Sequence, residues 1–292
     1  MKFAAFDIET SLSHELICGG IMLYSDKDIL SEYFWFQNNE NPAREMIDRL
    51  SSLREKGYTI VGFNSTFFDW RVLARDSGEY EVSETLALDS VDLMLEFFFR
   101  MGYMISLNNI LSRYSITQKR KKSIGKNGEY VEVGGPNVGQ LWEEKEYNVV
   151  LDYLSDDIRA TLELAEAIHA DDKILYRTSS GKEKELHLNG GLRKAIELWK
   201  IPEPDTSWIK NGVKRDHFFS WINITTDITI SAKWYWKESP LDNQIVWGKF
   251  RAKGQKNYAW PVYIIENVWY SLDGIVLSDE PIAWAYIQMR PK

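Results

Sequence analysis

Apolar residues in the first 172 positions recur with two periods, which together predict alternating strands and helices. Short apolar or alternating runs, such as Tyr33-Phe34-Trp35-Phe36, are typical of strands, and we expect strands near residues 2–8, 20–25, 31–36, 58–63 and 89–92. Helical spacing, with Asn41-Pro42 opening the first helix, predicts helices over about 42–56, 67–75, 93–100, 107–114 and 144–171. This order of elements predicts an α/β fold in which helices flank a mixed sheet.

The pattern changes after residue 173. One amphipathic helix is expected over about 191–199, followed by the segment Ile201-Pro202-Glu203-Pro204. From residue 221 onward strands dominate, at about 227–236, 245–251, 262–270, 275–278 and 282–289. Short strands at this spacing predict a small β-rich domain, either a barrel or a sandwich. We therefore expect a first domain over 1–172, a helical linker over 173–204 and a β-rich accessory domain over 205–292.

Length and composition exclude several classes of protein. No apolar run among the 292 residues approaches the ~18 residues needed to span a bilayer, and the N-terminus lacks the basic start and apolar block of a signal peptide. Cys18 is the only cysteine, which excludes a disulfide framework and a multi-cysteine zinc site. These features predict a cytoplasmic protein without a membrane segment.

Charge and tryptophan are unevenly distributed along the chain. Residues 1–172 carry 17 Lys and Arg against 30 Asp and Glu, a net charge of −13, whereas residues 173–292 carry 18 against 13, a net charge of +5. Nine of the twelve tryptophans lie beyond residue 190. An acidic first part and a basic, aromatic second part indicate that the two parts have different tasks.

Two acids on the first predicted strand suggest metal binding. Asp7 and Glu9 are two residues apart, so they point to the same side of the strand. Two carboxylates this close repel each other unless cations neutralise them, and hard oxygen ligands suit Mg²⁺ or Mn²⁺. The alternative is a pair of ordinary acids at a strand end, because Asp-x-Glu is common by chance.

Three further residues extend this pattern. Asp69 follows the strand predicted at 58–63 and falls in the first turn of a helix, where the helix dipole alone would also favour it. Tyr153 and Asp157 lie four residues apart on one face of the last predicted helix. Taken alone, that pair is also a common arrangement on a helix surface.

Taken jointly, these residues resemble a known family. Asp7-Ile8-Glu9, Asn64-x-x-x-Phe68-Asp69 and Tyr153-x-x-x-Asp157 are similar to the three motifs of DEDD 3′–5′ exonucleases of the tyrosine subtype. The resemblance is closest to the proofreading exonuclease domains of family B DNA polymerases and covers roughly residues 1–172. It is strengthened by matching segments, namely Val61-Gly62-Phe63-Asn64, Val91-Asp92-Leu93-Met94 and Ser106-Leu107-Asn108-Asn109. The family implies an RNase H-like fold.

The resemblance also implies a mechanism. Asp7, Glu9, Asp69 and Asp157 would hold two Mg²⁺ or Mn²⁺ ions for hydrolysis of a phosphodiester from a 3′ end, releasing nucleoside 5′-monophosphates. Tyr153 would orient the attacking water, since a free phenol ionises only near about pH 10. By the same resemblance, Thr10 and Asn64 would contact the terminal nucleotide and Phe68 would pack beneath it, although Phe68 also suits a plain core position.

Binding of the strand must overcome the acidity of the first part. A basic run, Lys119-Arg120-Lys121-Lys122, precedes a hairpin turn at Asn127-Gly128 and either holds the phosphate backbone or is an ordinary solvated turn. Basic residues of the C-terminal part alternate with Phe250, Tyr258 and Trp260, which is typical of single-strand binding but also of a barrel core. The expected partner is single-stranded nucleic acid, with DNA favoured over RNA.

Three functions remain open from the sequence. The first is a 3′–5′ exonuclease acting on single-stranded DNA, or as an exoribonuclease on RNA. The second is a nucleic-acid-binding protein with an inactive nuclease-like fold, which the presence of all four acids disfavours. The third is a recruitment protein that binds a protein partner through its C-terminal domain.

Overall fold

The computed structural model describes residues 2–25, 28–116, 122–209, 212–222, 245–250, 258–265, 268–271 and 283–286. The chain divides into two compact units, Met1–Val213 and Lys214–Lys292. Among the described residues, no helix is both long enough and apolar enough to cross a membrane. The basic residues at 119–121 lie outside the described part of the chain.

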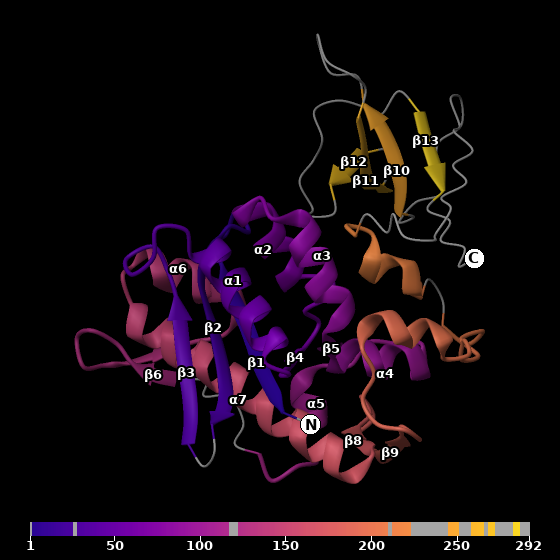
Figure 1. The fold of residues 1–292 in the computed structure, drawn as a ribbon, viewed down its shortest axis with the longest axis horizontal. Coiled ribbons are helices and arrows are strands. Elements are labelled where there is room, and N and C mark those ends of the chain that lie inside the picture. The colour runs from indigo at the N-terminus through magenta and orange to yellow at the C-terminus, as the bar shows by residue number, and fades with distance from the viewer. Residues whose placement is uncertain are drawn as a thin grey trace. The chain divides into compact units, whose positions relative to one another are not determined.

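The first unit contains a five-stranded mixed sheet in the order β3-β2-β1-β4-β5 (Figure 1). Its strands are β1 (Phe3–Thr10), β2 (Leu16–Ser25), β3 (Asp28–Phe34), β4 (Thr59–Gly62) and β5 (Val91–Asp92). The first three strands are antiparallel, whereas β4 pairs in parallel with both β1 and β5. The predicted α/β class is confirmed. The second and third strands begin earlier than expected, at residues 16 and 28 rather than 20 and 31.

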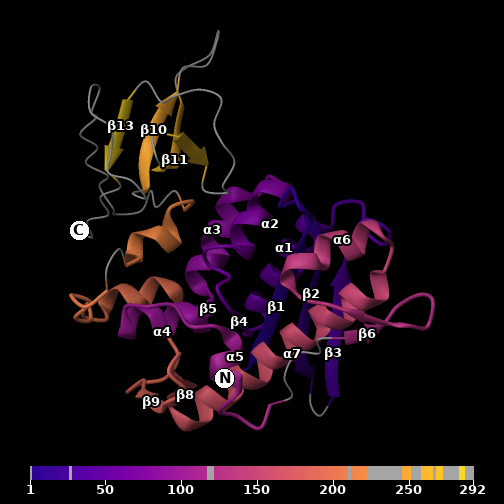
Figure 2. The ribbon, with the colours of Figure 1, turned by 180° about the vertical axis from the view of Figure 1, so that it is seen from behind.

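Helices cover both faces of this sheet. They are α1 (Pro42–Glu55), α2 (Asp69–Ser77), α3 (Tyr80–Asp89), α4 (Leu93–Met101), α5 (Leu107–Leu111), α6 (Val138–Glu143) and α7 (Tyr147–Asp171). Consecutive residues of a strand point to opposite faces. A Cβ on Gly19 of β2 would lie 2.5 Å from Met46 of α1, and a Cβ on Gly20 would lie 2.5 Å from Ile158 of α7. Hence α1 and α7 pack on opposite faces, as the two views in Figures 1 and 2 show.

Local signals explain where two of the helices begin. The Asn41 side chain accepts a hydrogen bond from the Arg44 N–H at 3.0 Å, and Pro42 occupies the first turn of α1, as the sequence predicts. The last helix was expected from about residue 144, but α7 starts at Tyr147. The backbone of Lys145 adopts a left-handed φ of 63°, which separates α6 from α7.

Two hairpins extend the first unit. The strands β6 (Lys122–Ile124) and β7 (Tyr130–Glu132) flank the turn predicted at Asn127-Gly128, where Gly128 takes a φ of 80°. The strands β8 (Lys173–Arg177) and β9 (Glu183–His187) form the second hairpin. They lie in the segment that we expected to be a helical linker.

The rest of that segment packs against the helical layer. The helix expected over 191–199 is a 3-10 helix, Ala195–Lys200. It is joined to the core because the Ala195 N–H donates to the Ser90 carbonyl at 2.8 Å and the rings of Trp199 and Phe99 lie 5.3 Å apart. The domain boundaries expected at residues 172 and 204 stay predictions.

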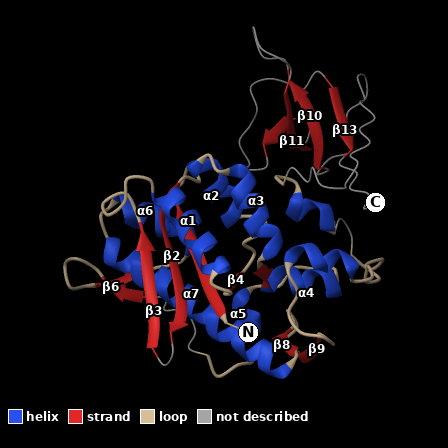
Figure 3. Cartoon of the chain, in the orientation of Figure 1, coloured by secondary structure: helices blue, strands red, loops and turns tan. Residues whose placement is uncertain are grey.

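The second unit contains a four-stranded antiparallel sheet in the order β12-β11-β10-β13. These strands, red in Figure 3, are β10 (Ile245–Phe250), β11 (Tyr258–Ile265), β12 (Val268–Ser271) and β13 (Ala283–Tyr286). A 3-10 helix, Arg215–Phe219, precedes them. The single strand expected over 262–270 is therefore two strands, while the strands expected at 227–236 and 275–278 lie outside the described residues.

Candidate metal centre

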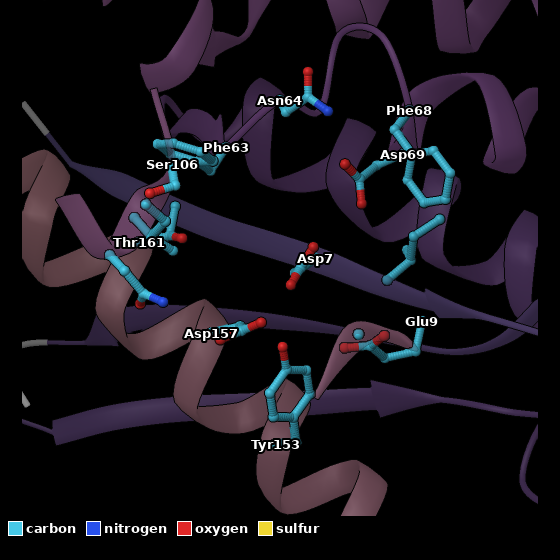
Figure 4. Close-up of a pocket in the computed structure, with 14 residues that line it drawn as sticks. Asp7, Glu9, Phe63, Asn64, Phe68, Asp69, Ser106, Tyr153, Asp157 and Thr161 are labelled. Carbon is cyan, nitrogen blue, oxygen red and sulfur yellow. The ribbon is translucent and has the colours of Figure 1, made fainter. Parts of the chain in front are cut away.

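Strand β1 presents the first two candidate ligands. Asp7 and Glu9 alternate with the buried side chains of Phe6 and Ile8, so both carboxylates emerge from the same face of the sheet. Both are half-buried, and Figure 4 shows them pointing into one cleft. The core side chains on either side anchor the strand and thereby hold the two acids in register.

Helix α7 brings a third acid and the tyrosine to the same cleft. Tyr153 and Asp157 are one helical turn apart, and both are largely buried, with 8% and 4% of their surface exposed. Carboxylate oxygens of Asp7, Glu9 and Asp157 lie within 4.8 Å of one another. The Tyr153 hydroxyl points toward the space between Asp157 and Glu9 (Figure 4).

Asp69 completes the cluster from a third element. It is the first residue of α2 and is 3% exposed. Burial raises the pKa of this carboxyl well above its usual range, and the negative charge of Asp7 and a hydrogen bond with Asp7 raise it further. Without a cation, Asp69 therefore takes up a proton more readily than an exposed carboxyl group does.

The donor set suits a hard divalent cation. Four carboxylates converge, and Asp69 Oδ1 is buried without a hydrogen-bond partner. Such an oxygen is costly to bury unless a proton or a cation satisfies it. Carboxylate oxygens are the ligands that Mg²⁺ and Mn²⁺ prefer. The residues present therefore fit a divalent metal site.

Cys18, by contrast, is not suited to bind a metal here. It lies opposite Glu9 in the β1–β2 register and is fully buried. Burial raises the pKa of its thiol, and the charges of Glu9 and Asp7 raise it further. The thiolate that a soft metal would need is therefore disfavoured.

The acids line a cavity of about 490 Å³, within the size range of small-molecule sites. Its lining includes Asp7, Ile8, Glu9, Phe63, Asn64, Phe68, Asp69, Ser106, Leu107, Asn108, Gly135, Tyr153, Asp157 and Thr161. The structure thus gathers the five candidate catalytic residues, together with Asn64 and Phe68, around one space.

Two candidate contact residues are not part of this lining. Thr10 ends β1 beyond an irregularity in its pairing with β2, and it is half-buried. Lys122 begins β6, where its Nζ lies 3.4 Å from a Glu132 carboxylate. Thr10 and Lys122 are both described in the structure, and neither side chain lines the cavity.

Polar residues that we had given no role also border the cavity. Ser106 caps α5 by accepting a hydrogen bond from the Asn109 N–H, and Thr161 lies one turn beyond Asp157 on α7. The spacing of Tyr153, Asp157 and Thr161 is a signal that could have identified the threonine. Ser106 belongs to the matching segment Ser106-Leu107-Asn108-Asn109, so the family resemblance could have identified it.

Comparison with known proteins identifies the family. The family model described as the RNase H superfamily matches residues 4–169, more than half of the chain. The chain belongs to the RNase H superfamily. The predicted RNase H-like fold is thereby confirmed, and the positions of all four acids and Tyr153 fall within residues 4–169.

A solved structure is also similar to this RNase H superfamily chain. It is the family B DNA polymerase from the hyperthermophilic archaeon Pyrobaculum calidifontis, with 19% identity and a TM-score of 0.40. The match covers 57% of this chain and 24% of the polymerase, so the chain spans about a quarter of that protein's length. No curated protein matches the chain.

Proposed function

We propose that the first unit is a metal-dependent 3′–5′ exonuclease that releases nucleoside 5′-monophosphates from single-stranded DNA. The observation that carries this proposal is the convergence of four carboxylates and a tyrosine hydroxyl in one cavity. RNase H superfamily membership supports a nuclease. The direction of cleavage and the substrate rest on the motif resemblance.

The carboxylates define where the chemistry would take place. Asp7, Glu9, Asp69 and Asp157 would hold two Mg²⁺ or Mn²⁺ ions, which when bound supply an ionised water and stabilise a leaving oxyanion. Without cations the four carboxylates repel one another, so the cluster attracts positive ions. Bound cations would then lie at the point where a phosphate must approach.

The remaining cavity residues would bind and orient. Tyr153 would donate a hydrogen bond to, or accept one from, the attacking water, because a phenol at neutral pH is a weak base and a good orienting group. Phe68 offers an aromatic face to the terminal base. Asn64 Oδ1 is buried without a hydrogen-bond partner and offers an acceptor to a sugar hydroxyl.

Holding a longer strand is a separate part of the proposal. The basic run Lys119-Arg120-Lys121-Lys122 and the basic C-terminal part are the candidates for phosphate contacts. Removing the second unit, which follows Val213, should weaken strand binding and spare cleavage of short oligonucleotides. Unchanged strand affinity would favour a protein partner for that part.

A single assay tests the activity. Labelled single-stranded DNA and RNA are incubated with Mg²⁺ and wild-type protein, Asp7→Ala or Asp156→Asn, and released mononucleotides are counted. Asp156 neighbours Asp157 on α7 but pairs with Arg159 at 4.0 Å and does not line the cavity, so it is the matched control. Release by wild type and control but not by Asp7→Ala supports the proposal. No release by wild type, or equal release by all three, refutes it.

A further inference from the structure

The carboxylate of Asp92 lies at the end of β5 and is fully buried. It accepts hydrogen bonds from four backbone N–H groups. Two belong to the first turn of α4, Met94 and Leu95, each at 3.1 Å from Oδ1. These two bonds cap the helix in the ordinary way.

The other two bonds reach a different part of the chain. The Asn64 N–H donates to Oδ1 at 2.9 Å and the Thr66 N–H donates to Oδ2 at 2.9 Å. Both donors lie in the loop between β4 and α2, 28 and 26 residues before Asp92. One buried carboxylate therefore joins this loop to the start of α4.

The loop that Asp92 holds is tightly folded. Asn64 has a left-handed φ of 62°, a conformation that L-residues seldom adopt. A Cβ on Gly62 would lie 2.4 Å from Ser65 Oγ, so the chain turns back directly on the end of β4. The Phe68 N–H closes the turn by donating to the Asn64 carbonyl at 3.2 Å.

This loop carries three residues of the candidate site. Asn64 and Phe68 line the cavity, and Asp69 follows as the first residue of α2. Asp92 itself does not line the cavity. Apart from its negative charge, which raises the pKa of Asp69, Asp92 can therefore act on the chemistry only through the loop.

We propose that Asp92 is a positioning residue, whose carboxylate fixes the loop so that Asn64 and Asp69 face the cluster on β1 and α7. The role in the exonuclease reaction rests on the function proposed above. A carboxylate suits this place because it is an acceptor at both oxygens, whereas an amide would direct N–H groups at backbone donors. Loosening the loop would displace one of the four metal ligands and leave the other three in place.

Two variants of the full chain separate capping from positioning. Serine is a good helix cap, but its single short oxygen cannot accept hydrogen bonds from both α4 and the loop between β4 and α2. Asp92→Ser therefore keeps the cap of α4 and loses the hydrogen bonds to the loop. Asp92→Asn keeps the shape of the side chain but replaces one accepting oxygen by an NH₂ group, which donates. The matched control is Glu96→Gln on the same helix. Glu96 is also fully buried, and it accepts hydrogen bonds from the Arg193 N–H at 3.0 Å and from Arg100, away from the cavity.

The first two measurements need no substrate. Hydrogen exchange of the metal-free protein should be about tenfold or more faster in residues 62–69 of both Asp92 variants, while α4 of Asp92→Ser exchanges as in wild type. Titration with Mn²⁺, followed by electron paramagnetic resonance, should show one class of site weakened by about 10- to 100-fold. Glu96→Gln should show neither faster exchange in the loop nor weaker Mn²⁺ binding, even if its melting temperature falls as far as that of the Asp92 variants.

The third measurement is turnover of labelled DNA. The Asp92 variants should lose kcat by about 10- to 100-fold, with a smaller change in KM, and Glu96→Gln should keep both. Wild-type exchange in the loop and wild-type Mn²⁺ affinity in both Asp92 variants would overturn the positioning role. If wild-type protein releases no mononucleotide, the proposed function fails, and the exchange and Mn²⁺ results still decide what Asp92 does.

Discussion

Replacing Asp157 by Asn should stabilise the protein without metal and destabilise it relative to wild type when Mg²⁺ is present. Asp157 faces Asp7 and Glu9 with carboxylate oxygens within 4.8 Å of one another. Two unit charges at that distance repel by about 0.9 kcal/mol at the dielectric constant of water and by about 3.5 kcal/mol at an effective value of 20. Asp157 has two such neighbours, and we take the lower limit for each, which gives a total gain of about 2 kcal/mol.

The expected shifts follow from the size of the unit. For a unit of 213 residues, about 2 kcal/mol corresponds to a melting temperature about 4–8 °C higher for Asp157→Asn in EDTA. A ligand at about 100 times its Kd stabilises the folded state by about 2.7 kcal/mol. Wild type should gain that much from Mg²⁺, whereas the variant, with one ligand lost, should gain less.

The assay is thermal unfolding with EDTA and with Mg²⁺ for wild type, Asp157→Asn and the control Asp156→Asn. When melting temperature is plotted against Mg²⁺ concentration, the curve of Asp157→Asn should begin above that of wild type and cross below it. The control should retain the full Mg²⁺ stabilisation, since Asp156 does not line the cavity. A variant that melts at or below wild type in EDTA, or that gains as much from Mg²⁺, would refute the electrostatic reasoning.

Three further outcomes are expected. The pKa of Asp69 is raised in the folded metal-free protein, whereas in the unfolded chain this carboxyl loses its proton above about pH 4, so the stability of the folded protein falls as the pH rises. In urea unfolding with EDTA, the stability advantage of Asp69→Asn over wild type should therefore grow from pH 4 to 7. A constant difference would contradict this. Tyr153→Phe should lower kcat about 10²-fold with unchanged Mn²⁺ affinity, and an unchanged kcat would remove the tyrosine from the chemistry. Gly62→Ala should lower the free energy of unfolding by about 2 kcal/mol, because its methyl group meets Ser65 Oγ. In the control Gly134→Ala the nearest atom lies 3.9 Å away, so its free energy of unfolding should stay within about 0.5 kcal/mol of wild type. Equal effects of the two substitutions in denaturant unfolding would refute the close contact.

Features set by neighbouring residues could be predicted from the sequence. Asn41-Pro42 and Asn127-Gly128 act within one turn, so the helix start and the hairpin turn follow from local chemistry. The common side of Tyr153 and Asp157 follows from helical geometry in the same way. The mixed sheet could be inferred because its strands and helices alternate along the chain.

The convergence of Asp7, Glu9, Asp69 and Asp157 could be expected only from the motif resemblance, and distant contacts outside those motifs could not be predicted. Nothing near Asp92 in the sequence shows that its carboxylate meets the N–H groups of Asn64 and Thr66. The 3-10 helix at Ala195–Lys200 likewise depends on a bond to Ser90, more than a hundred residues earlier. Such partners are known only once the chain has folded.

The location of the acids also links activity to the order of folding. Asp7 lies on β1 and Asp157 on α7, 150 residues later, and this helix packs directly against that strand. A chain in which α7 has not yet docked has at most three of the four acids in place, whatever else has folded. The complete site therefore forms only once this long-range contact between α7 and β1 is made. A partly folded chain would therefore be harmless to nucleic acid, and cleavage would report that this contact has formed.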